Sequence, residues 1–170
     1  MLNAMQNGTA NQIAGFSAEA VLCANQRREV FESNRHRVYA IAFWMTGNEL
    51  AAEDLMTDVF RSAFLVNPTP TVEDVDRALV GELRKTFHIP VFTLSCAPAT
   101  QVRNVRRNTL RTELEAAVLQ LPATEKLIFL MHDVERFEHE YIARLLGITD
   151  RESRLALHQG RLYLRELLAK

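Results

Sequence analysis

The chain has 170 residues, of which 48% are hydrophobic and 24% charged, and its formal net charge is −1 at pH 7. This length allows one ordinary domain or two small ones, and the composition is that of a globular protein. Cys23 and Cys96 lie far apart, which argues against a disulfide framework or a zinc site. No apolar run approaches the roughly 20 residues that span a bilayer. The N-terminus lacks the basic start and apolar core of a secretory signal, so we expect no membrane insertion and a cytoplasmic protein.

Charge is unevenly distributed along the chain. Residues 48–76 carry seven acidic side chains and one arginine, whereas residues 101–111 carry four arginines and no acid. Residues 139–170 carry six basic and four acidic side chains. An acidic middle and two basic later stretches suit a protein that contacts a basic protein and a phosphate backbone at once. Solvated helix faces would give the same pattern.

Helical periodicity runs through nearly the whole chain and predicts an all-α fold. After a polar tail, Ser17 can cap a short helix, and apolar residues from Val30 to Met45 mark the next helix, which ends at Gly47. An acidic helix begins near residue 48 and stops at the Asn-Pro-Thr-Pro sequence of residues 67–70. Another helix is predicted over residues 72–87.

This pattern stops between residues 88 and 108, where two prolines, a short apolar run (VFTLS) and several arginines occur. The run could be a short strand, a docking segment or part of either core. We therefore predict two small helical domains joined by a linker. The predicted segments are a tail and short helix (1–28), a first domain (29–88), the linker (89–108) and a second domain (109–170).

The end of the second domain, from residue 137 to residue 170, is predicted to be a helix-turn-helix. Gly147 allows the left-handed turn that ends its first helix. The second helix would start at Asp150 and bury one face, formed by Ser153, Leu157, Gly160, Leu164 and Leu168. Its opposite face would offer arginines to phosphates, and Gln159 or an arginine to base edges. Helix pairs of this kind also pack inside ordinary bundles.

The acidic helix offers a second candidate surface. Asp54 and Asp58 lie one helical turn apart, beside apolar Leu55 and Val59. Such a surface suits a protein partner with basic residues around an apolar centre. A solvated acidic face is the alternative.

Two strings resemble one family, the extracytoplasmic-function sigma factors of RNA polymerase. FESNRHRVYAIAFWMTGNELAAEDLMTDVFRSAF (31–64) resembles the family's polymerase-binding domain, and its AEDL…DVF portion is the most recognisable part. LQLPATEKLIFLMHDVERFEHEYIARLLGI (119–148) and the closing LHQGRLYLRELL resemble the family's second DNA-binding domain. The strings occur in the family's order and spacing.

The resemblance implies a transcription initiation protein that binds core RNA polymerase and directs it to promoter DNA, with no catalytic role and no cofactor. It implies polymerase contacts at Glu53, Asp54, Leu55, Asp58 and Phe60. It implies contacts with the minus-ten strand at Arg77, Arg84 and Lys85. It implies contacts with the minus-thirty-five element at Arg151, Arg154, His158, Gln159 and Arg161. It also implies that residues 89–108 run through the polymerase, and that a negative regulator, if there is one, is an anti-sigma protein.

Departures from the family's pattern support an alternative hypothesis. Glu152, Leu155 and Ala156 stand where the family usually has polar or basic residues, and the helix over residues 72–87 lacks the family's tryptophan. The alternative is a degenerate sigma-like regulator that acts by protein contact without promoter recognition. A third hypothesis, a helical metalloenzyme, would use the region of His132 and His139. We expect neither a metal nor catalysis, because the sequence has no Gly-rich phosphate loop and no Ser-based catalytic motif.

Overall fold

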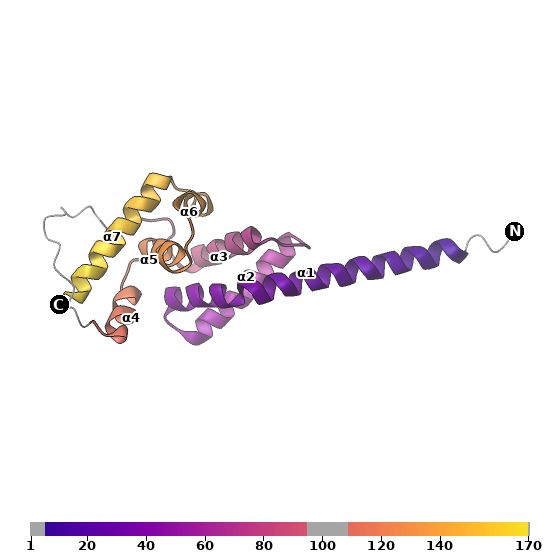
Figure 1. Cartoon of the computed structure of the whole chain (residues 1–170), viewed down its shortest axis with the longest axis horizontal. Coiled ribbons are helices and arrows are strands. Elements are labelled where there is room, and N and C mark those ends of the chain that lie inside the picture. The colour runs from indigo at the N-terminus through magenta and orange to yellow at the C-terminus, as the bar shows by residue number, and fades with distance from the viewer. Residues whose placement is uncertain (1–5, 95–108, 170) are drawn as a thin grey trace.

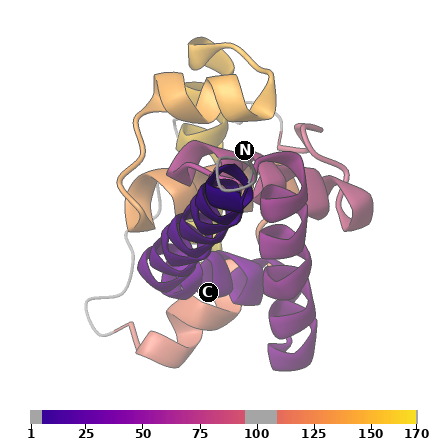
Figure 2. The ribbon, with the colours of Figure 1, turned by 90° about the vertical axis from the view of Figure 1, so that its right-hand side faces the viewer.

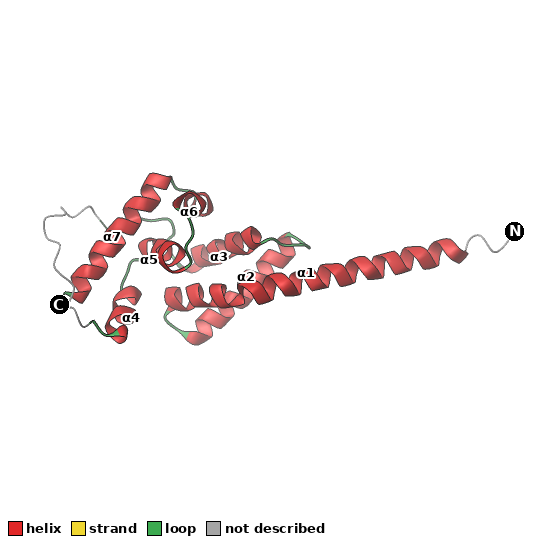
Figure 3. Cartoon of the chain, viewed as in Figure 1, coloured by secondary structure: helices red, strands yellow, loops and turns green. Residues whose placement is uncertain are grey.

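The structure, a computed structural model, describes residues 6–94 and 109–169, with side chains described from residue 19 onward. Within these residues every regular element is helical and there is no strand (Figures 1 and 3). The predicted all-α fold is therefore confirmed.

The first helix, α1 (Gln6–Thr46), is one continuous element of 41 residues. The prediction of a separate short helix before it was wrong, because no glycine or proline lies between Ser17 and Gly47 to end a helix. Gly47 ends it with a φ of +67°, as expected. The N-terminal part of α1 projects away from the rest of the molecule (Figure 1), and the predicted boundary at residue 28 falls inside the helix.

The base of this projection is held by the loop that follows α2 (Glu49–Val66). Cys23 Sγ and Arg27 Nε both donate to the carbonyl oxygen of Pro68, at 2.9 and 3.0 Å. The Arg27 guanidinium also lies 5.9 Å from the centre of the Phe64 ring. Cys23 is therefore a packing residue that fixes where α1 leaves the helical body.

The N-terminal half of the body consists of the rest of α1, of α2 and of α3 (Val72–Thr86). The residues predicted to mark helical faces form its interior. Those buried from the three helices include Val38, Ile41 and Met45, Val59 and Ala63, and Val75, Leu79 and Leu83.

The C-terminal half consists of four helices. They are α4 (Arg111–Leu119), α5 (Ala123–Phe129), α6 (His139–Leu146) and α7 (Asp150–Leu168), and α5 continues through a π-helical turn over Leu130–Val134. The turn at Gly147 between α6 and α7 has a φ of +67°, so the predicted helix-turn-helix is confirmed. Pro122 stands directly before α5, where its missing N–H leaves no bond unmade.

The two halves are packed against each other rather than held apart. α3 contacts α6, and α1 contacts α4 and α5, an arrangement visible from two directions (Figures 1 and 2). Buried side chains of both halves, from Val38 and Leu79 to Met131 and Ile142, belong to a single hydrophobic cluster. The main core of the described residues therefore crosses the predicted domain boundary, and a second, smaller cluster is formed by Ala117, Val118, Leu121 and Leu164.

The start of the predicted linker is a docking segment, the second of the three possibilities left open by the sequence. The Val91 backbone N–H donates to Thr124 Oγ1 at 3.0 Å. The backbone N–H groups of Thr93 and Leu94 both donate to Glu125 Oε1, at 2.9 and 3.0 Å. Residues 89–94 thus lie against α5, and the rest of the predicted linker, residues 95–108, lies outside the described residues.

Candidate protein and nucleic-acid interfaces

The acidic surface predicted on α2 is solvent-facing. The Asn48 side chain caps the helix by accepting from the Ala51 N–H at 3.0 Å. Glu53 and Asp54 are exposed. The Asp58 side chain is 47% exposed and accepts from Arg61 Nη1 at 2.8 Å. These carboxylates are available to a basic partner, although Asp58 already has a cationic neighbour on its own helix.

The apolar residues next to these acids are not the predicted ones. Phe60 was expected to contact the polymerase, but it is 4% exposed and its ring packs 4.8 Å from that of Phe31. Val59 is completely buried, and Leu55 packs partly against the core. Leu50 is 73% exposed instead.

The exposed position of Leu50 beside the acids could have been predicted from the sequence. This leucine stands three and four residues before Glu53 and Asp54, so all three share one helix face. The opposite side of α2 carries its buried residues, which are Ala52, Val59, Phe60 and Ala63. The candidate protein interface is therefore the face of α2 formed by Leu50, Glu53, Asp54 and, at its edge, Asp58.

The predicted strand contacts on α3 have partners within the chain. Arg77 bonds Glu73 at 2.7 Å and Asp74 at 3.4 Å. Asp74 also accepts from the Thr71 N–H in a capping box, and mainly through that bond its pKa lies below the ordinary value. Arg77 is thus part of the acidic N-terminal turn of α3, where it balances the local charge.

Lys85 makes a more buried pair with Glu82, whose side chain is 7% exposed. Burial alone would raise the pKa of Glu82, but the hydrogen bonds from Lys85 and from Ser62, the latter at 2.6 Å, outweigh it and lower the pKa. Arg84 reaches across to the other half and donates to the Leu146 carbonyl at 2.8 Å. All three cations remain exposed at their tips, yet each is bound to another part of the protein.

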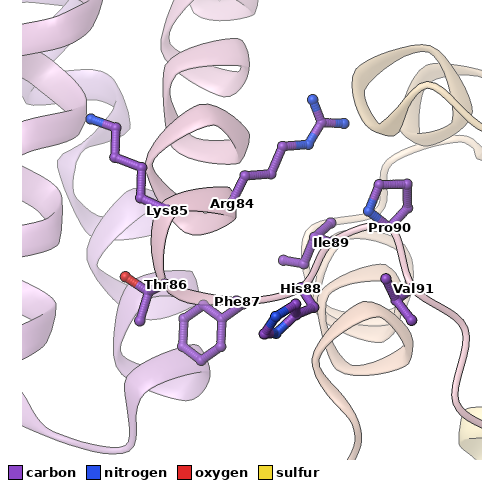
Figure 4. A pocket seen from close by; sticks show the side chains of 8 residues that line it. All are labelled: Arg84, Lys85, Thr86, Phe87, His88, Ile89, Pro90 and Val91. Atoms are coloured by element: carbon purple, nitrogen blue, oxygen red, sulfur yellow. The ribbon is translucent and has the colours of Figure 1, made fainter.

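A pocket of about 340 Å³ lies where α3 passes into the linker. Figure 4 shows Arg84 and Lys85 on the last turn of the helix, and the rings of Phe87 and His88 beside the chain below them. Ile89, Pro90 and Val91 complete the wall, with a cis peptide bond before the proline. Cations beside rings suit a nucleic-acid strand, in which bases stack and phosphates are neutralised.

The helix-turn-helix is fixed at its turn by a capping box. Thr149 Oγ1 accepts from the Glu152 N–H at 3.1 Å, and a Glu152 carboxylate oxygen accepts from the Thr149 N–H at 2.7 Å. Through these bonds, the backbone one first, the pKa of Glu152 is lowered. The Thr-x-x-Glu spacing is visible in the sequence, and it gives Glu152 a structural role at a position that had counted as a departure from the family.

The solvent face of α7 carries four of the five predicted DNA contacts. Arg151, Arg154, His158 and Arg161 are exposed. Arg154 bonds Asp150 at 2.7 Å, and its hydrogen bond lowers the pKa of that carboxyl. Arg161 bonds both carboxylate oxygens of Asp133, at 2.6 and 3.0 Å. This face is cationic and solvent-facing, as a phosphate-binding helix requires.

Gln159, the fifth predicted contact, is 7% exposed, so the prediction that it lies on the exposed face of α7 was wrong. It lines a pocket of about 220 Å³ together with Phe92, Leu94 and Glu125. Sequence periodicity alone could not place Gln159, because the linker that covers this side of α7 comes from a distant part of the chain. Ala156 is also buried, at 4% exposed, and lines the same pocket.

The two histidines considered as metal ligands are stacked, with ring centres 4.3 Å apart. His132 Nδ1 pairs with Asp133 at 2.8 Å, and His139 Nδ1 pairs with Ser153 Oγ at 2.9 Å. Burial, with the charge of His132 second, lowers the pKa of His139. Among the described residues no group of three or more His, Cys, Asp or Glu side chains could hold a metal ion. The stacked pair joins the π-helical turn after α5 to the first residue of α6, and the bond to Ser153 joins it to the first turn of α7.

Comparisons with known proteins show two sequence similarities. Residues 111–164 match the family model described as Sigma-70, region 4. The chain is 28% identical, over 159 residues, to the ECF RNA polymerase sigma factor SigE of Mycolicibacterium smegmatis. That alignment covers 84% of this chain and 61% of the relative, so the chain spans about three-fifths of the relative's length.

A solved structure gives the same fold. It is the sigma factor RpoE in complex with the anti-sigma factor NepR from Bartonella quintana, which matches with a TM-score of 0.57 at 17% identity. The match covers 91% of this chain and 96% of that one.

The capped helix-turn-helix with its cationic outer face lies within the part of this all-helical chain that is similar to Sigma-70, region 4. The chain is therefore similar in sequence to an extracytoplasmic-function sigma factor along most of its length, and similar in fold to the sigma factor of the solved structure. None of the described helices is both long enough and apolar enough to cross a membrane.

Proposed function

We propose that this protein binds core RNA polymerase and directs it to promoter DNA. The observation that carries the proposal is the helix-turn-helix inside the region 4 match, whose second helix turns Arg151, Arg154 and Arg161 to solvent. The proposed polymerase contact is the face of α2 that bears Leu50, Glu53 and Asp54. The site of action would be the cytoplasm, where polymerase and DNA meet.

On α7 the proposed contacts are mostly electrostatic. Arginines at positions 151, 154 and 161 would each displace about one counterion from DNA, so the logarithm of the binding constant should fall with log salt with a slope of roughly −3. Glu152 is directed back to the Thr149 N–H and not to the phosphates.

The regulator without promoter recognition is the less favoured alternative. This alternative was based on residues 152, 155 and 156, which depart from the family's pattern. Two of them have structural explanations, since Glu152 caps α7 and Ala156 is buried. Leu155 is 45% exposed and lines the pocket that Phe92 and Leu94 also line.

We further propose an anti-sigma protein as a partner. The support is the solved structure of similar fold, which is of a sigma factor with an anti-sigma factor. The exposed face of α2 is a surface that such a protein would cover in competition with the polymerase.

Run-off transcription with purified core enzyme tests the function. We expect a specific transcript from at least one promoter of the source genome, including the promoter of this protein's own gene. The double variant E53R/D54R should abolish both the transcript and co-purification with polymerase, because it reverses two exposed charges at the proposed contact. E29K, a charge reversal at an exposed position on α1, is the matched control and should leave both unchanged.

Two results would contradict the proposal. One is polymerase binding that survives E53R/D54R. The other is polymerase binding without a transcript from any promoter tested, together with DNA binding that shows no sequence preference, which would favour the alternative regulator.

A further inference from the structure

One buried carboxylate uses only one of its two oxygens. Glu125, on α5, is 1% exposed, and its Oε1 accepts from the backbone N–H groups of Thr93 and Leu94, at 2.9 and 3.0 Å. Its other oxygen, Oε2, is buried and has no hydrogen-bond partner among the described residues. Buried polar atoms are nearly always hydrogen-bonded, and a buried carboxylate oxygen without a donor lowers the stability of the fold. Glu125 therefore keeps one acceptor that a ligand can use.

The donors that hold this carboxylate carry no charge. Both bonds to Oε1 come from backbone amides, and Lys126, the next residue, donates to the Leu119 carbonyl oxygen at 2.8 Å. A buried charge is unfavourable unless an opposite charge or further hydrogen bonds compensate it. Because two donors fix the position of Oε1, the carboxylate is also held in one orientation, which favours binding at Oε2.

Glu125 lines the pocket of about 220 Å³ between α7 and the start of the linker. The other lining residues are two polar and four apolar ones, namely Glu152 and Gln159, and Phe92, Leu94, Leu155 and Ala156. Within the described part of the chain the lining thus has two carboxylates and no cationic side chain. Mainly apolar walls with a few polar groups are typical of small-molecule sites, and the charge of this lining favours a cation.

We propose that this pocket binds a small organic cation, a primary amine on an aromatic or aliphatic body. The ammonium group would donate to Glu125 Oε2, and the apolar body would pack between Phe92 and Leu155. An ammonium group has three donors and no acceptor, which suits a carboxylate oxygen without a donor. The ligand has to be small, because the pocket is below the roughly 300 Å³ of sites for drug-sized molecules. This site goes beyond the promoter-reading function proposed above and does not depend on it.

Titration of the full-length chain, followed by NMR spectra of its amide groups, tests the site. The probe is phenethylamine, and phenethyl alcohol is its uncharged counterpart of the same size. The amide signals of Thr93 and Leu94 should move with the amine, because their N–H groups share the Glu125 carboxylate with it. For so small a ligand we expect a dissociation constant in the millimolar range or tighter. The alcohol should bind at least about tenfold more weakly, because a hydroxyl donates without a charge.

Two variants separate the charge of the site from its space. E125Q keeps an oxygen for the N–H groups of Thr93 and Leu94 and removes the negative charge, so the preference for the amine over the alcohol should be lost. A156L fills the pocket and leaves the carboxylate in place, so neither probe should move the signals. E166Q, the same change of charge at an exposed position on α7, is the matched control and should respond as the parent does.

Several results would overturn the proposal. These are equal affinity of the parent for the two probes, a response to the amine that survives A156L, and signal changes confined to residues away from the pocket. The absence of a response to either probe would overturn it too, and would mean that an ordered water meets Oε2. The comparison of the two probes on the parent requires neither variant to fold. It also requires neither DNA nor polymerase, so a failure of the promoter function would leave it unaffected.

Discussion

Gly160, in the second helix of the helix-turn-helix, is expected to be replaceable by alanine with a gain in stability. It is buried in α7 against α5, but a Cβ at this position would stand 3.7 Å from Glu125 Cβ and 3.8 Å from the Glu125 carbonyl oxygen. These are ordinary van der Waals distances, so the new methyl group fits without displacement of its neighbours. Alanine in a helix interior is favoured over glycine by about 1 kcal/mol. G160A should therefore raise the free energy of unfolding by about 1 kcal/mol, or the melting temperature by roughly 2–4 °C for a chain of this size.

Thermal unfolding followed by circular dichroism at 222 nm measures the effect. G147A is the matched control with the opposite sign: nothing lies within 4 Å of its Cβ, but its φ of +67° is unfavourable for alanine by about 1–2 kcal/mol. DNA affinity of G160A should be unchanged, because the solvent face of α7 is untouched. A lower melting temperature for G160A would refute the packing described for α5 and α7.

Three further predictions concern Phe60 and Gln159, whose burial was not predicted from the sequence, and His139. F60A should lower the free energy of unfolding by about 3–5 kcal/mol in urea denaturation, whereas L50A, at an exposed position, should change it little. A stable F60A protein that had lost only polymerase binding would show that Phe60 is a surface contact after all. Q159A should leave the sequence preference of DNA binding unchanged in a gel-shift assay, while H158A should alter affinity; a changed base preference in Q159A would contradict the burial of Gln159. The pKa of His139 lies below 6.5 in the folded state, so the unfolded state takes up a proton first and stability should fall as the pH drops below 6.5, by at most about 1.4 kcal/mol per pH unit. H139Q should remove that part of the dependence in denaturation curves at pH 7.5 and 5.5, and an identical pH dependence in both proteins would contradict it.

Much of the fold could be predicted because local signals determine it. The apolar spacing on α3 and the left-handed turn at Gly147 each depend on a few neighbouring residues, and the structure has them as predicted. The capping boxes at Thr71 and Thr149 follow the same rule. The α1 helix differs only because Ser17, a good helix cap in isolation, stands inside a stretch with nothing to interrupt a helix.

Predictions about the site failed where burial depends on distant parts of the chain. The linker covers Gln159 from residues 92 and 94, and nothing near Gln159 in the sequence indicates that cover. Phe60 stands two residues after Asp58 in the acidic segment. In the helix the two residues are about 200° apart, so Asp58 faces solvent and Phe60 faces the core.

Asp76, a buried carboxylate on α3, is the clearest example of a position that depends on distant parts of the chain. Its partners, Arg37 and the Tyr141 hydroxyl, are 39 and 65 residues away in sequence, whereas the neighbouring acids Glu73 and Asp74 are partly exposed. A buried carboxylate has to be hydrogen-bonded, because an unpaired charge in the interior costs several kcal/mol. The packing of α6 on α3 and α1 therefore depends on a set of polar contacts that water can replace when the halves separate. The contact between the two halves is therefore specified by a polar centre as well as by the apolar core that they share.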